Sequence, residues 1–333
     1  MSNNRITVWT PVFNGEKTLS RCIESIVGQS IKPFEYLILD DCSTDGTLKI
    51  AYDYAENFPW IKVIENDVNK GAFANFNRIL HLAKGDYLYA VAADDFSFPQ
   101  TIKSFTDAFL KWPNAAVFFG DESIVNEFGV TIAKETLTYL NQTTYIEPKD
   151  FSEYYLKKVP CNHSLAPASL FKKSLLDELN GYNEKIGFWA DSFIQRFGAL
   201  KYGSVYIPKV VHAFSVNPNS MSNNIGDSIE IIRFLESTSN LMKRSDFSNF
   251  FPPEYVDSWE VEYRKIISRS FHDKFNILNN QKNSHLSKIL ECEETSALTK
   301  RLLSAFIKIE QFITNCFVRS FSEKFLTHSF KKN

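Results

Sequence analysis

The sequence predicts an α/β protein built on a mostly parallel sheet, and two observations carry this prediction. In the first half, short β-prone or apolar runs alternate with stretches whose apolar residues recur at helical spacing. Connections of helix length between such runs imply right-handed crossovers between parallel strands. The chain has 333 residues, 44% hydrophobic and 23% charged, which suits one large α/β domain with a smaller appendage.

The expected elements follow one another in order along the chain. The run 36–39 is apolar at every position, as in a strand buried on both faces. We expect strands at 6–9, 36–39, 61–64, 87–92 and 117–121, with helices over 19–27, from 47 and over 73–83. The second half is less regular, with helices at 174–179 and 192–200, a late strand pair within 206–214, a loop at 217–224 and helical patterning from about 225.

Two acidic pairs stand at expected strand ends, Asp40-Asp41 and Asp94-Asp95. Ligands of parallel α/β sheets bind at the carboxyl ends of the strands. Paired carboxylates are costly there unless cations or hydrogen-bond donors balance them. Capping of the following helices would explain one such pair. Two pairs favour a joint polar site, in which a hard divalent cation bridges a diphosphate.

Several ordered motifs resemble those of family 2 glycosyltransferases. The resemblance covers residues 5 to 222, and it rests on the set of motifs rather than on any one of them. The motifs are Thr10-Pro11-Val12-Phe13-Asn14, Gln29-Ser30, Asp40-Asp41-Cys42-Ser43-Thr44-Asp45-Gly46, Asn69-Lys70-Gly71, Lys84-Gly85-Asp86, Ala93-Asp94-Asp95 with Pro99, Gly181-Tyr182-Asn183-Glu184 and Trp189-Ala190-Asp191.

The resemblance implies a GT-A fold, the Rossmann-like nucleotide-diphospho-sugar transferase fold. Residues 1–222 would form the catalytic domain, with a donor-binding half at 1–121 and an acceptor-binding half at 122–222. Residues 223–333 would form a helical C-terminal region. The implied activity is inverting transfer of a sugar from a nucleotide-diphosphate sugar, with UDP as the expected nucleotide, to a hydroxyl of a glycan or lipid-linked acceptor, in cell-surface polysaccharide or oligosaccharide assembly.

The resemblance also implies roles for single residues. Pro11, Val12 and Phe13 would flank the base, Asp41 would bond its edge, and Asp94 would lie near the ribose. Asp95 would bind Mn²⁺ or Mg²⁺, which stabilises the leaving diphosphate. Asp191 would be the general base that deprotonates the acceptor. The remaining expected site residues are Asn14, Asn69 and Gly71 for the donor, and His163 and Trp189 for the acceptor. A purely structural role is an equally open alternative for His163 and for Trp189.

The sequence departs from the family pattern at three positions. Ala92 replaces the first acid of the usual Asp-x-Asp, Ala190 precedes Asp191 where Glu is frequent, and Asn217 stands where many members have His. The two alanines leave open an alternative, a catalytically inactive carbohydrate-binding or scaffold protein of the same fold. The Gln-x-x-Arg-Trp motif of processive members is absent, which favours transfer of a single sugar.

Other classes of protein fit the sequence less well. No two glycines are separated by one residue, which excludes the dinucleotide-binding fingerprint, and there is no P-loop motif. A net charge of −2 predicts no nucleic-acid partner. Five scattered cysteines, no secretory leader and no long apolar stretch predict a cytoplasmic protein. The oligomeric state stays open.

The C-terminal tail, residues 300–333, has seven basic and two acidic residues, with apolar residues every three or four positions. This pattern is typical of a basic amphipathic helix. Such a helix either packs on protein or lies on an anionic membrane surface, which would put the protein at the inner face of the cell membrane. His212, inside an apolar run, is expected to be a packed core residue.

Overall fold

The computed structural model describes residues 5–159, 165–216 and 228–265. Predictions for His163, for the loop at 217–224 and for the tail 300–333 lie outside these residues.

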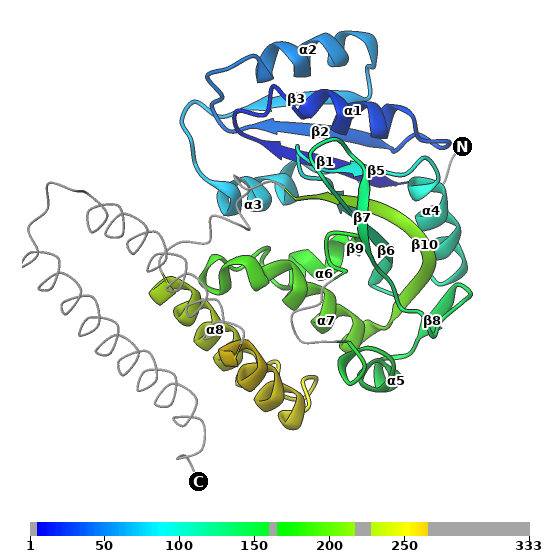
Figure 1. The fold of residues 1–333 in the computed structure, drawn as a ribbon, viewed down its shortest axis with the longest axis vertical. Coiled ribbons are helices and arrows are strands. Elements are labelled where there is room, and N and C mark those ends of the chain that lie inside the picture. Colours follow the sequence, from blue (N-terminus) through cyan, green and yellow to red (C-terminus); the bar gives the residue numbers. More distant parts are fainter. Residues whose placement is uncertain (1–4, 160–164, 217–227, 266–333) are drawn as a thin grey trace, which may run out of the picture.

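One ten-stranded sheet forms the centre of the molecule (Figure 1). Its strand order is β3-β2-β1-β4-β9-β6-β10-β5, and β7 pairs with β6 while β8 pairs with β10. The strands are β1 (Ile6–Val12), β2 (Glu35–Asp40), β3 (Ile61–Glu65), β4 (Tyr87–Ala90), β5 (Phe96–Ser97), β6 (Val117–Val125), β7 (Thr131–Glu135), β8 (Thr144–Ile146), β9 (Ser169–Lys172) and β10 (Ser204–Ser215).

The predicted parallel strands of the first half are confirmed. β3, β2, β1 and β4 run parallel to one another, so their carboxyl ends meet at one edge. Beyond β4 the sheet is mixed, because β9 runs antiparallel to both β4 and β6. The late strand pair was a wrong prediction. A single strand, β10, spans that region, and register shifts between Ile207 and His212 absorb Pro208, which cannot donate to the ladder.

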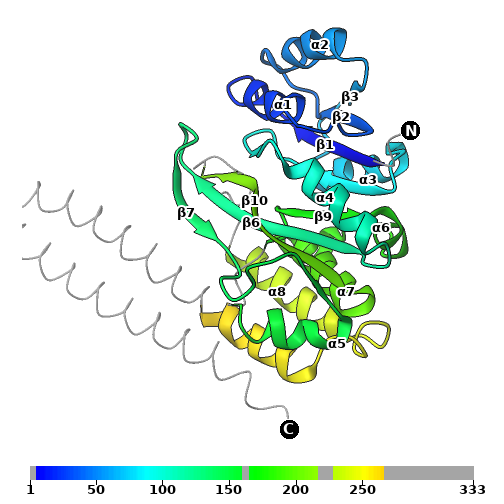
Figure 2. The same cartoon turned by 90° about the vertical axis from the view of Figure 1, so that its right-hand side faces the viewer.

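Helices cover both faces of the sheet (Figures 1 and 2). One hydrophobic cluster contains buried residues of α1, α2 and α4 with one face of the strands, and a second contains those of α3, α6, α7 and α8 with the other. The helices are α1 (Leu19–Val27), α2 (Thr47–Asn57), α3 (Ala72–Leu82), α4 (Thr101–Lys111), α5 (Pro148–Phe151), η1 (Ser152–Leu156), α6 (Lys173–Glu178), η2 (Glu184–Trp189), α7 (Ala190–Tyr202) and α8 (Ser228–Lys243), and residues 253–265 form a further helix.

The C-terminal helices share a core with the sheet. Leu235 of α8 and Trp259 of the helix 253–265 belong to the same buried cluster as Phe119 of β6. The division of the chain at residue 222 therefore stays a prediction, since described residues on both sides of it contribute to one core. Among the described residues, no helix combines the length and the apolar character needed to cross a bilayer.

Gly181, after α6, offers a test of the contact between this turn and α3. Its φ is +86°, and a Cβ there would lie 2.2 Å from the side-chain oxygen of Asn77, which accepts a hydrogen bond from the Tyr182 amide. Gly181→Ala therefore combines backbone strain with a clash, and we expect it to lower the free energy of unfolding by about 3 kcal/mol or more. Chemical denaturation measures the loss.

Gly129→Ala is the matched control. Gly129 has a similar φ of +77°, but the nearest atom to a Cβ there is 3.4 Å away. Gly129→Ala should lower the free energy of unfolding only through backbone strain, by about 1 kcal/mol. Equal losses in the two variants would show that the clash with Asn77 contributes nothing.

Candidate active site

The turn after β4 carries the acidic pair Asp94-Asp95. Asp95 is buried, and its carboxylate accepts a hydrogen bond from the Ser215 amide at 2.7 Å. Its other oxygen lies 3.2 Å from Nε2 of His212. Asp94 is only partly buried. The neighbouring acids thus differ, because Asp95 joins the turn to β10 while Asp94 remains at the surface of the sheet edge.

His212 is buried as expected, yet it is a polar partner of the site rather than only a packed ring. Its Nδ1 lies 3.1 Å from the Tyr89 hydroxyl, which also lies 2.9 Å from the Ser97 hydroxyl. Burial lowers the pKa of His212, but the hydrogen bond and charge of Asp95 outweigh burial and raise it overall. The apolar residues around His212 in the sequence concealed this role.

Arg21 of α1 connects three segments at the same edge. Its guanidinium donates to the Asp94 carbonyl at 2.8 Å, to the Ser215 hydroxyl at 3.1 Å and to the Glu127 carbonyl at 3.4 Å. It also lies 5.2 Å from the centre of the Phe96 ring. Arg21 therefore holds the acidic turn against the end of β10 and the β6–β7 hairpin, a role that the sequence analysis missed.

Asp41, at the end of β2, organises the loop before α3. One carboxylate oxygen accepts from the Lys70 amide and the Asn66 side chain, each at 2.8 Å, and the other accepts from the Gly71 amide at 2.9 Å. Burial raises the pKa of Asp41, but these hydrogen bonds outweigh it and lower the pKa below 3.8. Asn69 is exposed, and its side chain also accepts from Gly71. Both carboxylate oxygens of Asp41 are thus engaged by the protein.

Gly71 leaves room at the start of α3. Its φ is +79°, which favours glycine, and no atom of the described residues lies within 4 Å of the position a Cβ would take. An open space at a helix N-terminus suits an anionic or polar ligand.

The end of β1 lies beside this loop. Val12 is buried and its carbonyl accepts from the Asp41 amide at 2.8 Å, whereas Phe13 is 51% exposed. The pairing of β1 with β4 ends at Trp9, two residues before Pro11, whereas Pro11 still lies opposite Leu39 of β2. The amide hydrogen that proline lacks is therefore not needed for the pairing with β4. Asn14 has a φ of +50° and accepts from the Thr44 amide at 2.8 Å. These residues therefore border the same sheet edge as Asp41.

Asp191 lies in the first turn of α7 and is partly buried. Burial raises its pKa, against the opposing effects of Ser192 and Arg196. Trp189, two residues before it, is 7% exposed. The centre of its ring lies 3.8 Å from the centre of the Tyr263 ring and 5.5 Å from the centre of the Trp259 ring. The structure thus uses Trp189 as a core residue.

Glu122 of β6 is a further acid in this region that the sequence analysis did not select. It is 5% exposed, and its Oε1 has no hydrogen-bond partner among the described residues. Burial raises its pKa to about 8; His212 opposes this, while the charges of Asp95, Glu135 and Asp191 add to it. Glu122 therefore lies within electrostatic reach of both Asp95 and Asp191. The adjacent acids Asp121 and Glu122 inside the strand 117–125 were the available signal.

The residues at this edge fit a divalent cation that is held partly by substrate. The described residues contain no group of three or more His, Cys, Asp or Glu side chains arranged to hold a metal ion by themselves. Mg²⁺ in phosphate-transfer sites is commonly bound by one or two carboxylates together with substrate phosphates. Asp94 and Asp95 are the carboxylates of this turn, and the two oxygens of Asp95 lie near the Ser215 amide and the His212 ring.

The comparison with known families decides the identity of the fold. The sequence model of Glycosyl transferase family 2 matches residues 7–179, more than half of the 333 residues. The chain belongs to glycosyl transferase family 2. The predicted family and its GT-A fold are thereby confirmed. The match contains the acidic motifs after β2 and β4, and it ends before Asp191.

Curated relatives are similar over part of their length. The putative glycosyltransferase EpsE of Bacillus subtilis is 38% identical over 134 residues, 40% of this chain and 48% of that protein. The poly(ribitol-phosphate) beta-glucosyltransferase of Bacillus spizizenii is 32% identical over 182 residues, 52% of this chain and 26% of that protein. The chain thus spans about half or less of the length of these relatives.

Solved structures share the fold. TarS 1–349 of S. aureus, in complex with UDP-GlcNAc, has a TM-score of 0.60 at 20% identity, covering 78% of this chain and 71% of that one. The mannosyltransferase PcManGT of Pyrobaculum calidifontis, in complex with GDP-Man and Mn²⁺, has a TM-score of 0.52 at 18% identity, covering 98% and 86%.

Removal of the Asp41 carboxylate tests its role in holding the loop before α3. We expect Asp41→Ala to lower the free energy of unfolding at neutral pH by about 2 kcal/mol or more, since charge-assisted hydrogen bonds are lost. Because the folded state lowers the pKa of Asp41, its contribution is present above pH 3.8 and is lost as the pH falls through the folded value. The difference from wild type should therefore shrink at acidic pH, as measured by urea unfolding.

Asp53→Ala provides the control. Asp53 forms an exposed pair with Lys49 at 2.7 Å, and its removal should change stability by less than about 0.5 kcal/mol. A loss in Asp41→Ala that does not depend on pH would contradict the ionic role of Asp41.

Proposed function

We propose that this chain is a non-processive, inverting glycosyltransferase. It moves one sugar from a nucleotide-diphosphate sugar, with UDP as the expected nucleotide, to a hydroxyl of a glycan or lipid-linked saccharide. Its setting is cell-surface polysaccharide or oligosaccharide assembly. The observation that carries this proposal is the family match over residues 7–179, which contains the acidic pair Asp94-Asp95 in the turn after β4.

The comparisons support the donor and acceptor classes. The related structures of TarS and PcManGT hold UDP-GlcNAc and GDP-Man, which favours a nucleotide sugar as donor. The name of one relative combines glucosyl transfer with poly(ribitol-phosphate), which favours a polymer or glycan acceptor. Mn²⁺ accompanies the nucleotide sugar in PcManGT, and this favours a divalent cation here.

The proposed reaction follows from the positions of these groups. The donor lies along the edge formed by the ends of β1, β2 and β4, with its base between Pro11 and Phe13 and its diphosphate near Asp94. Asp191 accepts the proton of the acceptor hydroxyl, whose oxygen forms the new bond to the anomeric carbon. The nucleotide diphosphate leaves with the electrons of the broken bond. A bound Mn²⁺ or Mg²⁺ would stabilise the charge that develops on this leaving group.

A donor screen with Asp191→Asn tests the proposal. We expect at least one nucleotide sugar with Mn²⁺ to be transferred or slowly hydrolysed by the wild-type protein, measured as release of the free nucleoside diphosphate. Asp191→Asn should lose transfer by about 100-fold or more, because a neutral amide cannot accept the proton, while its thermal shift with donor is retained. Undiminished turnover in Asp191→Asn would remove Asp191 from the mechanism. No turnover and no thermal shift with any donor would contradict the enzyme proposal and favour an inactive binding protein.

The adjacent acids are separable by a second pair of variants. We propose that Asp94, rather than Asp95 as the family pattern suggests, contributes the carboxylate nearest the metal and diphosphate. Asp94→Asn should then weaken Mn²⁺ binding in the presence of UDP, measured by calorimetry. Asp95→Asn should lower the melting temperature, because Asp95 bonds Ser215 and His212. Weakened Mn²⁺ binding in Asp95→Asn alone would restore Asp95 as the ligand.

A further inference from the structure

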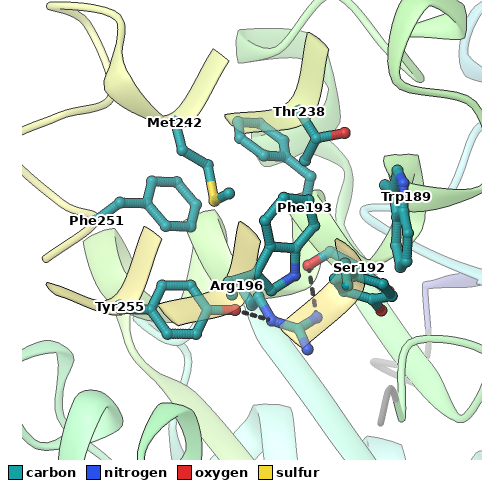
Figure 3. A pocket seen from close by; sticks show the side chains of 10 residues that line it. Trp189, Ser192, Phe193, Arg196, Thr238, Met242, Phe251 and Tyr255 are labelled. Atoms are coloured by element: carbon teal, nitrogen blue, oxygen red, sulfur yellow. Dashed lines mark hydrogen bonds between the residues drawn. The ribbon is translucent and has the colours of Figure 1, made fainter. Parts of the chain in front are cut away.

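A buried arginine lies beneath the turn that carries Asp191. Arg196 of α7 is 5% exposed, and its Nη1 donates to the Ser192 carbonyl at 3.2 Å (Figure 3). The side chain thus runs back toward the start of the helix, the direction that helical side chains favour. The Ser192 amide in turn donates to a carboxylate oxygen of Asp191 at 2.5 Å. The guanidinium and the proposed base are therefore joined through one residue.

Aromatic residues fix the other side of the guanidinium. Its Nε donates to the Tyr255 hydroxyl at 2.9 Å, and its centre lies 5.6 Å from the centre of the Tyr155 ring. Figure 3 shows Arg196 pointing between Tyr255 and Ser192 in a cleft lined mainly by aromatic side chains. A buried cation held by directional bonds on two sides has little freedom to move.

Tyr255 comes from a part of the chain that the family match does not reach. It belongs to the helix 253–265, whereas the match ends at residue 179. Two neighbours on this helix, Trp259 and Tyr263, pack against Trp189, immediately before α7. The C-terminal helix thus contacts both the start of α7 and the arginine beneath it.

We propose that Arg196 and Tyr255 are positioning residues for the carboxylate of Asp191, so that the C-terminal helical region completes the active site. Tyr255 holds the guanidinium in place, and the guanidinium keeps Asp191 ionised and oriented. This inference rests on the proposed role of Asp191 as general base. It makes the helix 253–265 necessary for full activity although no residue of it touches the reacting atoms.

The charges around Asp191 determine the direction in which its pKa changes when Arg196 is replaced. Burial raises the pKa of Asp191, and the Arg196 charge lowers it. The charge of Asp191 in turn contributes to the raised pKa of Glu122 on β6 and of Tyr182 ahead of η2. Tyr255 and Tyr263, from the helix 253–265, lie within electrostatic reach of Arg196. Burial is the largest effect on Asp191, and the hydrogen bonds of Ser192 and the Arg196 charge oppose it; loss of the arginine charge removes one of these opposing effects, so the pKa of Asp191 should rise.

The test measures the carboxyl of Asp191 directly. In protein labelled with ¹³C at the aspartate side chains, the Asp191 signal is the one absent from Asp191→Asn. We expect this signal to titrate about 0.5 to 1 pH unit higher in Arg196→Gln than in the wild type. Arg196→Lys keeps the positive charge, so its Asp191 signal should titrate close to the wild-type pH. Tyr255→Phe should shift the titration in the same direction by less, since it removes one hydrogen bond and keeps the ring.

Kinetics with the donor found in the screen supply the second readout. We expect kcat to fall about tenfold or more in Arg196→Gln, with the acid limb of its pH profile displaced upward and KM for the donor unchanged. Arg244→Gln is the control, because Arg244 is an exposed arginine of the same helical region that pairs with Asp246 at 2.6 Å. It should leave the Asp191 titration and kcat at wild-type values.

The outcomes separate this inference from the proposed function. An Asp191 signal that titrates at the wild-type pH in both Arg196→Gln and Tyr255→Phe would overturn the positioning role, whatever the activity. If Arg196→Gln does not fold, Tyr255→Phe alone decides the question. A shifted titration together with an active Asp191→Asn would leave the electrostatic coupling intact and overturn only the role of Asp191 as base.

Discussion

The site depends on the buried carboxylate of Asp95. This carboxylate accepts a hydrogen bond from the Ser215 amide and lies beside the His212 ring. It therefore fixes the turn after β4 to the far end of β10, 117 or more residues later in the chain. A carboxylate buried without such donors would cost several kcal/mol, and here the donors come from a different part of the sheet. Arg21 strengthens the same junction from α1.

The second half of the chain completes what the first half begins. The parallel strands β1, β2 and β4 provide one edge with Asp41 and Asp94, but Asp191 and His212 come from α7 and β10. Glu122 on β6 lies within reach of charges from both groups. The C-terminal helices then close the core beneath α7, since Trp259 and Leu235 belong to the same buried cluster as Phe119 of β6. The residues of the candidate site therefore belong to one folded unit.

Local patterns predicted the first half well. The apolar run 36–39 became a fully buried β2, and the helix expected from residue 47 begins at Thr47. Such elements depend on periodicity within a few residues, which sequence shows directly. The direction of β9 and the single bent strand β10 were not predictable in this way. Strand direction and register depend on partners that lie far away in sequence.

The sequence by itself determined the family, the parallel core and the acidic residues that end its strands, because ordered motifs and periodic burial are local properties. Only the tertiary structure decided what each acid does. Asp94 and Asp95 are adjacent and chemically identical, yet the partners of Asp95 bury it while Asp94 stays accessible. The same holds for Trp189, which packs in the core, and for Arg196, which Tyr255 holds beneath Asp191. Burial and hydrogen-bond partners arise from contacts between distant segments, and these exist only in the folded chain.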